Sequence, residues 1–294
     1  MSDFVQQQNS ICDFATSDSW VILSPIEQSI KKKIEAVGTP LKDWDINIYR
    51  GVLTGCNEAF IIDSEKRDEI LANCQTEDER QRTAELIRPI LRGRDIKRYG
   101  YVDNGLYLIN THNGVRGRIP RIKIEDYPAV KAHLDQYWDR IATRADKGDT
   151  PYNLRNCAYL EDFFKPKIIY PNMTKYMPFV FDNKLYLTNQ KCFIITGKRV
   201  AYLTAFFNSS LFKYCFRDSF PELQGGTREL SKIFFDKIPV YEVSDAQNLQ
   251  FQEAVEDIQN EYTKQKAQRI DSMLFDLYAL TADERKVIGF VEIV

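Results

Sequence analysis

The feature that most limits the fold is a run of short β-type segments in the second half of the chain. Between residues 166 and 196 the sequence reads "PKIIYP", "MPFVFD", "LYLTN" and "KCFIIT", with polar turns between them. Short runs rich in Ile, Phe and Tyr are typical of strands. Helical spacing of apolar residues precedes them at 124–146 and follows them at 199–218 and from 245 to the end. We therefore expect an α+β fold with a small, curved antiparallel or mixed sheet, flanking helices and a helical C-terminal segment.

The other elements also have recognisable signatures. The segment "SPIEQSIKKKIEAVG" (24–38) predicts a helix that Ser24 caps, with Pro25 at the first position and Glu27 completing a capping box. The aromatic side chains of 199–218 are expected to lie in the core. Further predicted elements are two strands around a glycine-containing turn in 46–63, a charged helix in 76–88 and a strand in 105–110.

Charge is distributed unevenly along a chain whose formal net charge is only -2. Residues 241–294 carry 5 Lys+Arg and 11 Asp+Glu, a local balance of -6. Residues 90–123 carry eight cations and two acids, and they share most of the basic segment "RPILRGRDIKRYGY" (88–101). Two interpretations remain open for this segment: a salt-bridged surface that faces water, or a surface that meets a polyanion.

Histidine is scarce, and the abundant carboxylates cannot be paired into an acid-base couple from the sequence. The chain has six cysteines and two histidines, and no two cysteines form a C-x-x-C pair, which argues against a zinc site. No glycine-rich nucleotide loop, H-E-x-x-H or G-x-S-x-G motif occurs. We therefore predict no catalytic residues and no metal ligands in this chain.

The sequence contains no sign of a membrane segment or a leader. No apolar run approaches the roughly 20 residues that cross a bilayer. The N-terminus, "MSDFVQQQNSICDF", lacks the basic and apolar regions of a signal peptide. We expect a cytoplasmic protein without a membrane partner.

Seven segments along the chain form a series. They are "DWDINIYRGVLTGCNEAFIID", "IRPILRGRDIKRYGY", "YLEDFFKPKIIYPNMTKYMPFVFD", "YLTNQKCFIIT", "YLTAFFNSSLFKYCFRD", "GGTRELSKIFFDKIPV" and "IDSMLFDLYALTADERKVI". In this order they resemble the C-terminal target-recognition region of TaqI-like adenine-N6 DNA methyltransferases and of type IIG restriction–modification enzymes. The resemblance implies a bacterial domain that grips double-stranded DNA opposite a methyltransferase domain, reads a short base sequence and helps present one extruded adenine.

The catalytic motifs of this family are missing from the sequence. Neither an Asn/Asp-Pro-Pro-Tyr/Phe motif nor a nuclease core is found. The segment most similar to the first motif, "YPNMTKY" (170–176), lacks its two consecutive prolines. The resemblance therefore implies a non-catalytic recognition part with no cofactor of its own. S-adenosylmethionine and Mg²⁺ are expected only for a methyltransferase or endonuclease domain of the same parent polypeptide. Two alternatives stay open: an enzyme with an unrecognised active site, and a protein-interaction scaffold.

Three regions are expected within this framework. Residues 1–44 form an N-terminal lead-in and helix, and residues 45–240 form the DNA target-recognition domain. Residues 241–294 form a helical segment that packs on this domain or on the catalytic partner. Because this last segment is acidic, we do not expect it to face phosphates.

Phosphate contacts are expected from clustered cations, which supply much of the affinity of proteins for DNA. The leading candidates are Arg92, Arg94, Lys97 and Arg98, followed by Arg116, Arg118 and Arg121. The alternative for each is an internal salt bridge, and Asp95 is expected to pair with one of the arginines. Gly225, Gly226 and Thr227 are expected to expose backbone N–H groups at a helix N-terminus, with Arg228 adding charge; the alternative is a tight turn capped by Thr227.

Base readout is expected from the connection between the strands at 167–170 and 179–181. The candidates there are Asn172, Thr174, Lys175 and Tyr176. Asn and Lys side chains can bond base edges, and Tyr can stack or wedge. Asn189, Gln190 and Lys191 join neighbouring strands and are expected to extend the same surface. A plain polar hairpin tip is the alternative.

Overall fold

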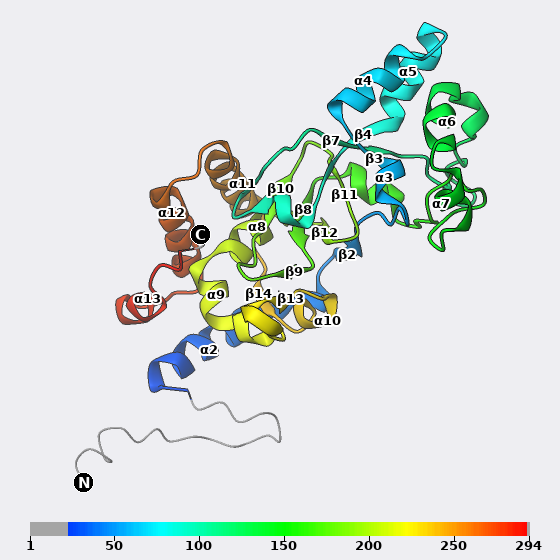
Figure 1. The fold of residues 1–294 in the computed structure, drawn as a ribbon. Coiled ribbons are helices and arrows are strands. Elements are labelled where there is room, and N and C mark those ends of the chain that lie inside the picture. Colours follow the sequence, from blue (N-terminus) through cyan, green and yellow to red (C-terminus); the bar gives the residue numbers. More distant parts are fainter. Residues whose placement is uncertain (1–22, 293–294) are drawn as a thin grey trace.

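The computed structural model describes residues 23–292, and its architecture is α+β, with 47% helix and 20% strand (Figure 1). The expected fold class is confirmed, while the predicted lead-in before residue 20 lies outside the described residues. Within residues 23–292 the strands form two four-stranded sheets and three two-stranded ribbons. The short β-type segments are strands β8 (Lys167–Pro171), β10 (Val180–Asp182), β11 (Leu187–Thr188) and β12 (Cys192–Gly197).

A central sheet separates two hydrophobic cores. Its strand order is β10-β8-β12-β2, where β2 is Ile46–Arg50, and every pair is antiparallel. Because side chains alternate along a strand, Ile168 of β8 packs into one core while Ile169 packs into the other. Strand β12 divides in the same way between Ile195 and Ile194. Burial of both faces explains why these strands are almost uniformly apolar.

Helices from both ends of the chain cover one face of this sheet. They are α2 (Pro25–Val37), α8 (Val200–Asn208), α9 (Ser210–Phe216), α11 (Asp245–Asn260), α12 (Lys264–Leu277) and α13 (Ala282–Ile288). Helix α2 begins with the predicted Ser24 capping box. Phe206, Phe207 and Phe212 are fully buried, which confirms their expected place in the core. The C-terminal helices also contribute to this core, because α11 packs on α8 and β10.

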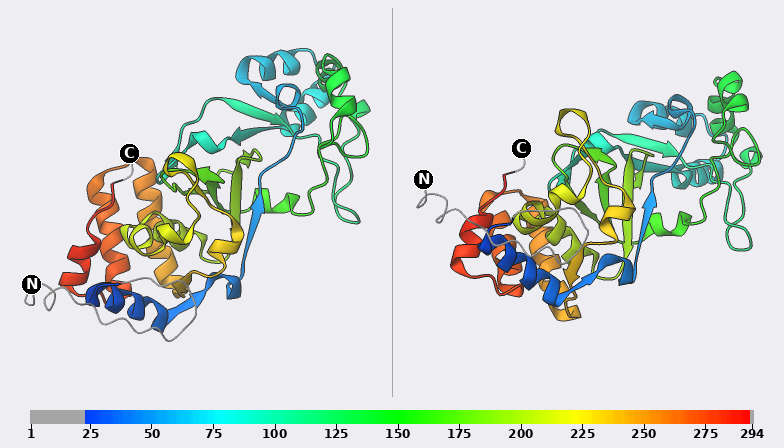
Figure 2. Two further views of the ribbon diagram at one scale, coloured as in Figure 1. Left: turned by 60° about the horizontal axis from the view of Figure 1, so that its bottom comes forward. Right: turned by 90° about the horizontal axis from the view of Figure 1, so that it is seen from below.

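A second lobe covers the other face, and its sheet has the strand order β11-β4-β7-β3. The elements of this lobe are α3 (Asn57–Phe60), β3 (Ile61–Asp63), α4 (Ser64–Ala72), α5 (Glu77–Leu86), β4 (Ile87–Leu91), β7 (Leu106–Ile109), α6 (Pro128–Asp135) and α7 (Trp138–Thr143). Strand β11 runs parallel to β4, whereas β7 is antiparallel to both of its neighbours. Figure 2 shows the helices of this lobe at the end of the molecule opposite α11–α13.

The two strands predicted in residues 46–63 exist, but they do not pair around a turn. Strand β2 belongs to the central sheet and β3 to the second lobe, with α3 between them. After β2, the N–H of Gly51 donates to the carbonyl of Cys192 (2.9 Å) and that of Val52 donates to the carbonyl of Thr188 (2.7 Å). These bonds carry the chain along the 188–192 turn into the second lobe. Helix α4 was not predicted, because its apolar residues form no stripe.

Two other predicted elements differ from the structure. Residues 124–146 form a 3-10 turn (Ile124–Asp126) and the separate helices α6 and α7 rather than one helix. The helix expected directly after Gly226 is replaced by strand β13 (Arg228–Glu229), and α10 (Lys232–Phe235) begins only after Ser231. The remaining short strands are β1 (Gly38–Pro40) paired with β14 (Pro239–Tyr241), β5 (Ile96–Lys97) paired with β6 (Gly100–Tyr101), and β9 (Met173–Thr174) paired with β13.

No helix within residues 23–292 combines the length and the apolar character that crossing a membrane requires.

Gly51 provides a test of the connection between the two lobes. A Cβ atom at this position would lie 2.0 Å from the backbone oxygen of Asn189, closer than any real contact. We predict that Gly51→Ala lowers the free energy of unfolding by about 1–3 kcal/mol or more, because backbone must shift to relieve the overlap. Gly100→Ala is the matched control, since a Cβ atom there meets nothing within 4 Å. Urea unfolding of both variants measures the effect, and equal stabilities contradict the proposed role of Gly51.

Candidate nucleic-acid interface

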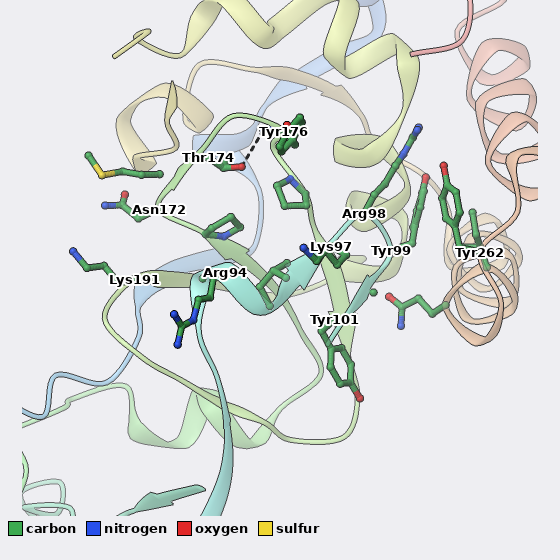
Figure 3. Close-up of a pocket in the computed structure, with 18 residues that line it drawn as sticks. Arg94, Lys97, Arg98, Tyr99, Tyr101, Asn172, Thr174, Tyr176, Lys191 and Tyr262 are labelled. Carbon is green, nitrogen blue, oxygen red and sulfur yellow. Dashed lines mark hydrogen bonds between the residues drawn. The ribbon is translucent and has the colours of Figure 1, made fainter. Parts of the chain in front are cut away.

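The structure brings distant basic and polar segments together around one cleft of about 680 Å³ (Figure 3). One side is formed by residues 93–101 and another by residues 171–178, which are widely separated in the sequence. Lys191 adds a third segment, and the corner between α11 and α12 adds a fourth. The basic segment and the predicted base-readout loop therefore share one surface.

The cleft is lined by cations and contains no acidic side chain. Arg94, Lys97 and Lys191 line it and are exposed. Among the ion pairs of the described residues, none involves these three side chains. Cations gathered in a concave surface without counter-charges create a local positive potential, even when the protein as a whole is slightly acidic.

Two other arginines of the basic segment are held by partners within the protein, although Arg98 also lines the cleft. The guanidinium of Arg92 donates from Nε and Nη2 to the two carboxylate oxygens of Asp95, both at 3.0 Å, which confirms the expected pairing of that acid. Arg98 is only 7% exposed and donates to the backbone carbonyls of Val291 (2.8 Å) and Asn208 (2.7 Å). These guanidinium groups hold the segment in its fold, so they are not presented to a phosphate in this structure.

The loop of residues 172–176 forms a compact turn at the cleft. The Thr174 hydroxyl accepts the N–H groups of Tyr176 (3.1 Å) and Met177 (3.2 Å), and Figure 3 shows the first of these bonds. This turn leaves Lys175 and Tyr176 exposed, whereas Asn172 and Thr174 are half-buried. Asn172, Thr174 and Tyr176 line the cleft, and Lys175 stands next to it.

The Gly-Gly turn lies beside the same loop, because β13 pairs with β9. A Cβ atom at Gly226 would lie 4.0 Å from the Cε atom of Lys175. Both glycines have φ of 76°, which favours glycine. Thr227 is half-buried in an extended conformation, not at the start of a helix. Arg228 is buried and donates to Asp218 and Glu222, both at 2.8 Å, so its charge is neutralised internally.

The turn of residues 189–191 contributes only one exposed side chain. Asn189 is buried, and its side-chain oxygen accepts the N–H of Lys191 at 3.1 Å. Gln190 is half-buried. The carbonyl of Lys191 accepts the N–H of Asn172 (2.9 Å), which fixes this turn against the loop. Lys191 is therefore the member of the predicted group that reaches the cleft.

The second group of predicted phosphate contacts lies elsewhere. Arg116, Arg118 and Arg121 are exposed but do not line the cleft. Arg118 pairs with Glu161 at 2.5 Å and Arg121 pairs with Asp149 at 3.1 Å. The salt-bridged interpretation fits these two arginines.

The lining of the cleft also limits its chemistry. It includes no carboxylate, imidazole or thiol, the groups that most often serve as general bases or metal ligands. Within residues 23–292 there is also no group of three or more His, Cys, Asp or Glu side chains placed to hold a metal ion. The charged side chains of the lining are all cationic.

Lys213, which the sequence did not single out, supports the loop of residues 172–176 from the interior of the protein. The Lys213 amine is fully enclosed and donates to the carbonyl of Met177, immediately after the loop. It lies 5.1 Å from the ring centre of Phe179 and 5.3 Å from that of Phe212. Burial lowers the pKa of Lys213 well below its usual value, with the nearby positive charges of Arg98 and Arg217 acting in the same direction. A lysine inside an aromatic helix gives no sequence signal of this role.

Comparison with known proteins identifies a family and a fold. The family model of the TaqI-like C-terminal specificity domain matches residues 88–240, slightly more than half of the chain. The Type IIL restriction–modification enzyme MmeI, solved in complex with DNA, has a similar fold with a TM-score of 0.56 and 11% identity, over 83% of this chain and 34% of that one. The type IIG restriction endonuclease BpuSI has a TM-score of 0.53 and 13% identity, over 87% and 33%. This chain thus spans about a third of the length of each.

The buried amine predicts a pH-dependent contribution to stability. Since the pKa of Lys213 is lower in the folded state, the unfolded state binds more protons in the pH window between that lowered pKa and ~10.4, the ordinary lysine value. The folded wild type therefore gains stability relative to Lys213→Met as pH rises toward that value, by up to about 1.4 kcal/mol per pH unit. Urea unfolding of both proteins at several alkaline pH values measures the difference. Lys32→Met, which removes an exposed lysine, is the control. A difference that stays constant with pH contradicts the burial of a lysine with a lowered pKa.

Proposed function

The chain belongs to the family of TaqI-like C-terminal specificity domains, and from this premise we propose that it binds duplex DNA and reads a short base sequence for a restriction–modification enzyme. The observation that carries the proposal is the cleft, where Arg94, Lys97 and Lys191 converge without any acidic side chain. Duplex DNA presents one negative charge per about 1.7 Å of helix axis, so such a surface attracts it strongly. The MmeI structure, which contains DNA, supports a shared role through its similar fold.

We divide the surface into two roles. Arg94, Lys97 and Lys191 hold the phosphate backbone, because they are exposed and unpaired among the described residues. Lys175 and Tyr176, at the tip of the loop, reach the base edges. Backbone contacts of the first kind set position, whereas only contacts with bases distinguish sequences. Asn172, Thr174 and the Gly-Gly turn support the loop from its flanks.

Catalysis is assigned to another domain. The cleft offers no carboxylate, imidazole or thiol that could transfer a proton or hold a metal ion. We propose that S-adenosylmethionine and Mg²⁺ act on a methyltransferase or endonuclease domain of the parent polypeptide. This chain supplies the site to that domain and performs no chemical step itself.

The phosphate contacts are tested by DNA binding at several salt concentrations. Arg94→Ala, Lys97→Ala and Lys191→Ala are each expected to weaken binding to every sequence alike. Each is also expected to reduce the slope of log K against log salt by about 1, because one fewer counterion is released. Lys32→Ala removes an exposed cation of α2 that does not line the cleft, and it should leave both quantities unchanged. If the wild type does not bind DNA even at low salt, the chain is not a DNA-recognition domain by itself.

Base readout is tested by the sequences that the protein selects from a random pool of duplexes. Lys175→Ala is expected to relax the preference at one position of the selected site, at a loss of about 1–3 kcal/mol for the original base. Lys97→Ala should keep the same preference with lower affinity overall. An unchanged selected site in Lys175→Ala shows that Lys175 does not read bases.

A further inference from the structure

The corner between α11 and α12 forms one wall of the cleft, although it belongs to the acidic C-terminal segment. Ile258, Gln259 and Tyr262 line the cleft there. Tyr262 is 45% exposed, and Figure 3 shows its ring beside Tyr99, on the opposite side of Lys97 from Arg94. This corner lies outside residues 88–240, which the family model covers.

The corner is rigidly attached to the central sheet. The Gln259 side chain accepts the N–H of Phe181 at 2.8 Å and donates to the carbonyl of Phe181 at 2.9 Å. Ile258 is fully buried, and the Thr263 hydroxyl caps α12 by accepting the N–H of Lys266 at 3.2 Å. Tyr262 stands between these anchored residues. An aromatic ring presented on a fixed backbone loses little entropy when a partner covers it.

The acidic character of the segment does not extend into the cleft. Asp257 pairs with Lys266 at 3.1 Å, so its charge is neutralised within the corner. Glu261 is exposed next to Tyr262, but it does not line the cleft. The corner residues that line the cleft are therefore uncharged, and the charged side chains of the remaining lining are cationic.

Three large apolar side chains stand exposed around this one cleft. Met173 is 52% exposed, Tyr176 is 49% exposed and Tyr262 is 45% exposed. Exposed apolar groups that gather at a concave surface mark a binding site. With cations between them and no acid, they fit a ligand that carries both an anionic backbone and flat apolar rings. Nucleic acid has this combination, and a tyrosine ring can stack on a base or pack on a sugar.

We propose that Tyr262 is a DNA-contact residue, whose ring packs on the sugar or base of a nucleotide while Arg94 and Lys97 hold the adjoining phosphates. The C-terminal helical segment is then part of the recognition surface as well as of the core. This inference rests on the proposed function, because it requires the cleft to bind DNA.

The test compares Tyr262→Ala, Tyr262→Phe and Leu249→Ala in DNA binding at several salt concentrations. Tyr262→Ala should weaken binding by about 5- to 150-fold, the range found for loss of one aromatic stacking contact. The slope of log K against log salt should not change, because the ring releases no counterion. Tyr262→Phe keeps the ring and should bind like the wild type. Leu249→Ala removes an apolar side chain of α11 that is 59% exposed and does not line the cleft, so it serves as the matched control.

The outcomes separate this inference from the proposed function. If Tyr262→Ala binds like the wild type while Lys97→Ala weakens binding, the proposed function stands and the role of Tyr262 is overturned. If neither the wild type nor any variant binds DNA at low salt, the proposed function itself fails. Thermal unfolding checks that each variant is folded. If Tyr262→Ala loses both its fold and its affinity, Tyr262→Leu replaces it in the comparison. Tyr262→Leu should fold and bind DNA weakly. A Tyr262→Leu variant that binds as tightly as the wild type shows that the aromatic ring is not required and overturns the inference.

Discussion

The burial of the central sheet on both faces is the constraint on which the rest of the structure depends. In strand β8, Ile168 faces the helical core and Ile169 faces the second lobe, so neither face has room for a functional polar group. The exception, Lys167, pairs with Asp182 at 2.5 Å in the interior and serves the fold. A buried pair of this kind is strongly destabilising when one partner is lost. The polar side chains that we propose for DNA binding therefore lie beyond the strand ends, where residues 172–176 and 189–191 meet.

Anchoring in the core also explains why the cations of the basic segment (88–101) have two different roles. The strand β5 and its neighbour Tyr99 are anchored in the core, and the N–H of Tyr99 donates to the carbonyl of Phe179 at 3.1 Å. An anchored segment of this length exposes only some of its side chains. Arg98 also lines the cleft, but it is buried and binds backbone carbonyls, whereas Arg94 and Lys97 are exposed there. Charge density in a sequence therefore overstates the number of cations that a ligand can meet.

The cleft is held from several directions by elements far apart in the sequence. Lys213 of α9 bonds the backbone just after the loop, Gln259 of α11 bonds the strand that follows, and β13 pairs with the loop itself. These supports place the loop on a rigid base, which recognition of a base edge requires. They also tie the C-terminal helices to the surface that we propose for DNA. The shape of the cleft therefore depends on contacts made by these helices.

The sequence by itself determined the α+β class, the capped helix α2, the strands of residues 166–196 and the family. These features depend on the spacing of nearby residues and on the order of motifs, both of which can be read without a structure. The sequence also located the basic segment and the loop at 172–176. Only the tertiary structure decided which cations remain available to a ligand. Arg92 and Arg98 are bonded to groups within the protein, and no local sequence pattern specifies those partners. The tertiary structure also placed Tyr262 in the cleft, because the corner between α11 and α12 meets the basic segment only when the chain folds. The separation of β2 from β3 has the same origin: both strands are locally encoded, but their partners are chosen by long-range hydrogen bonds.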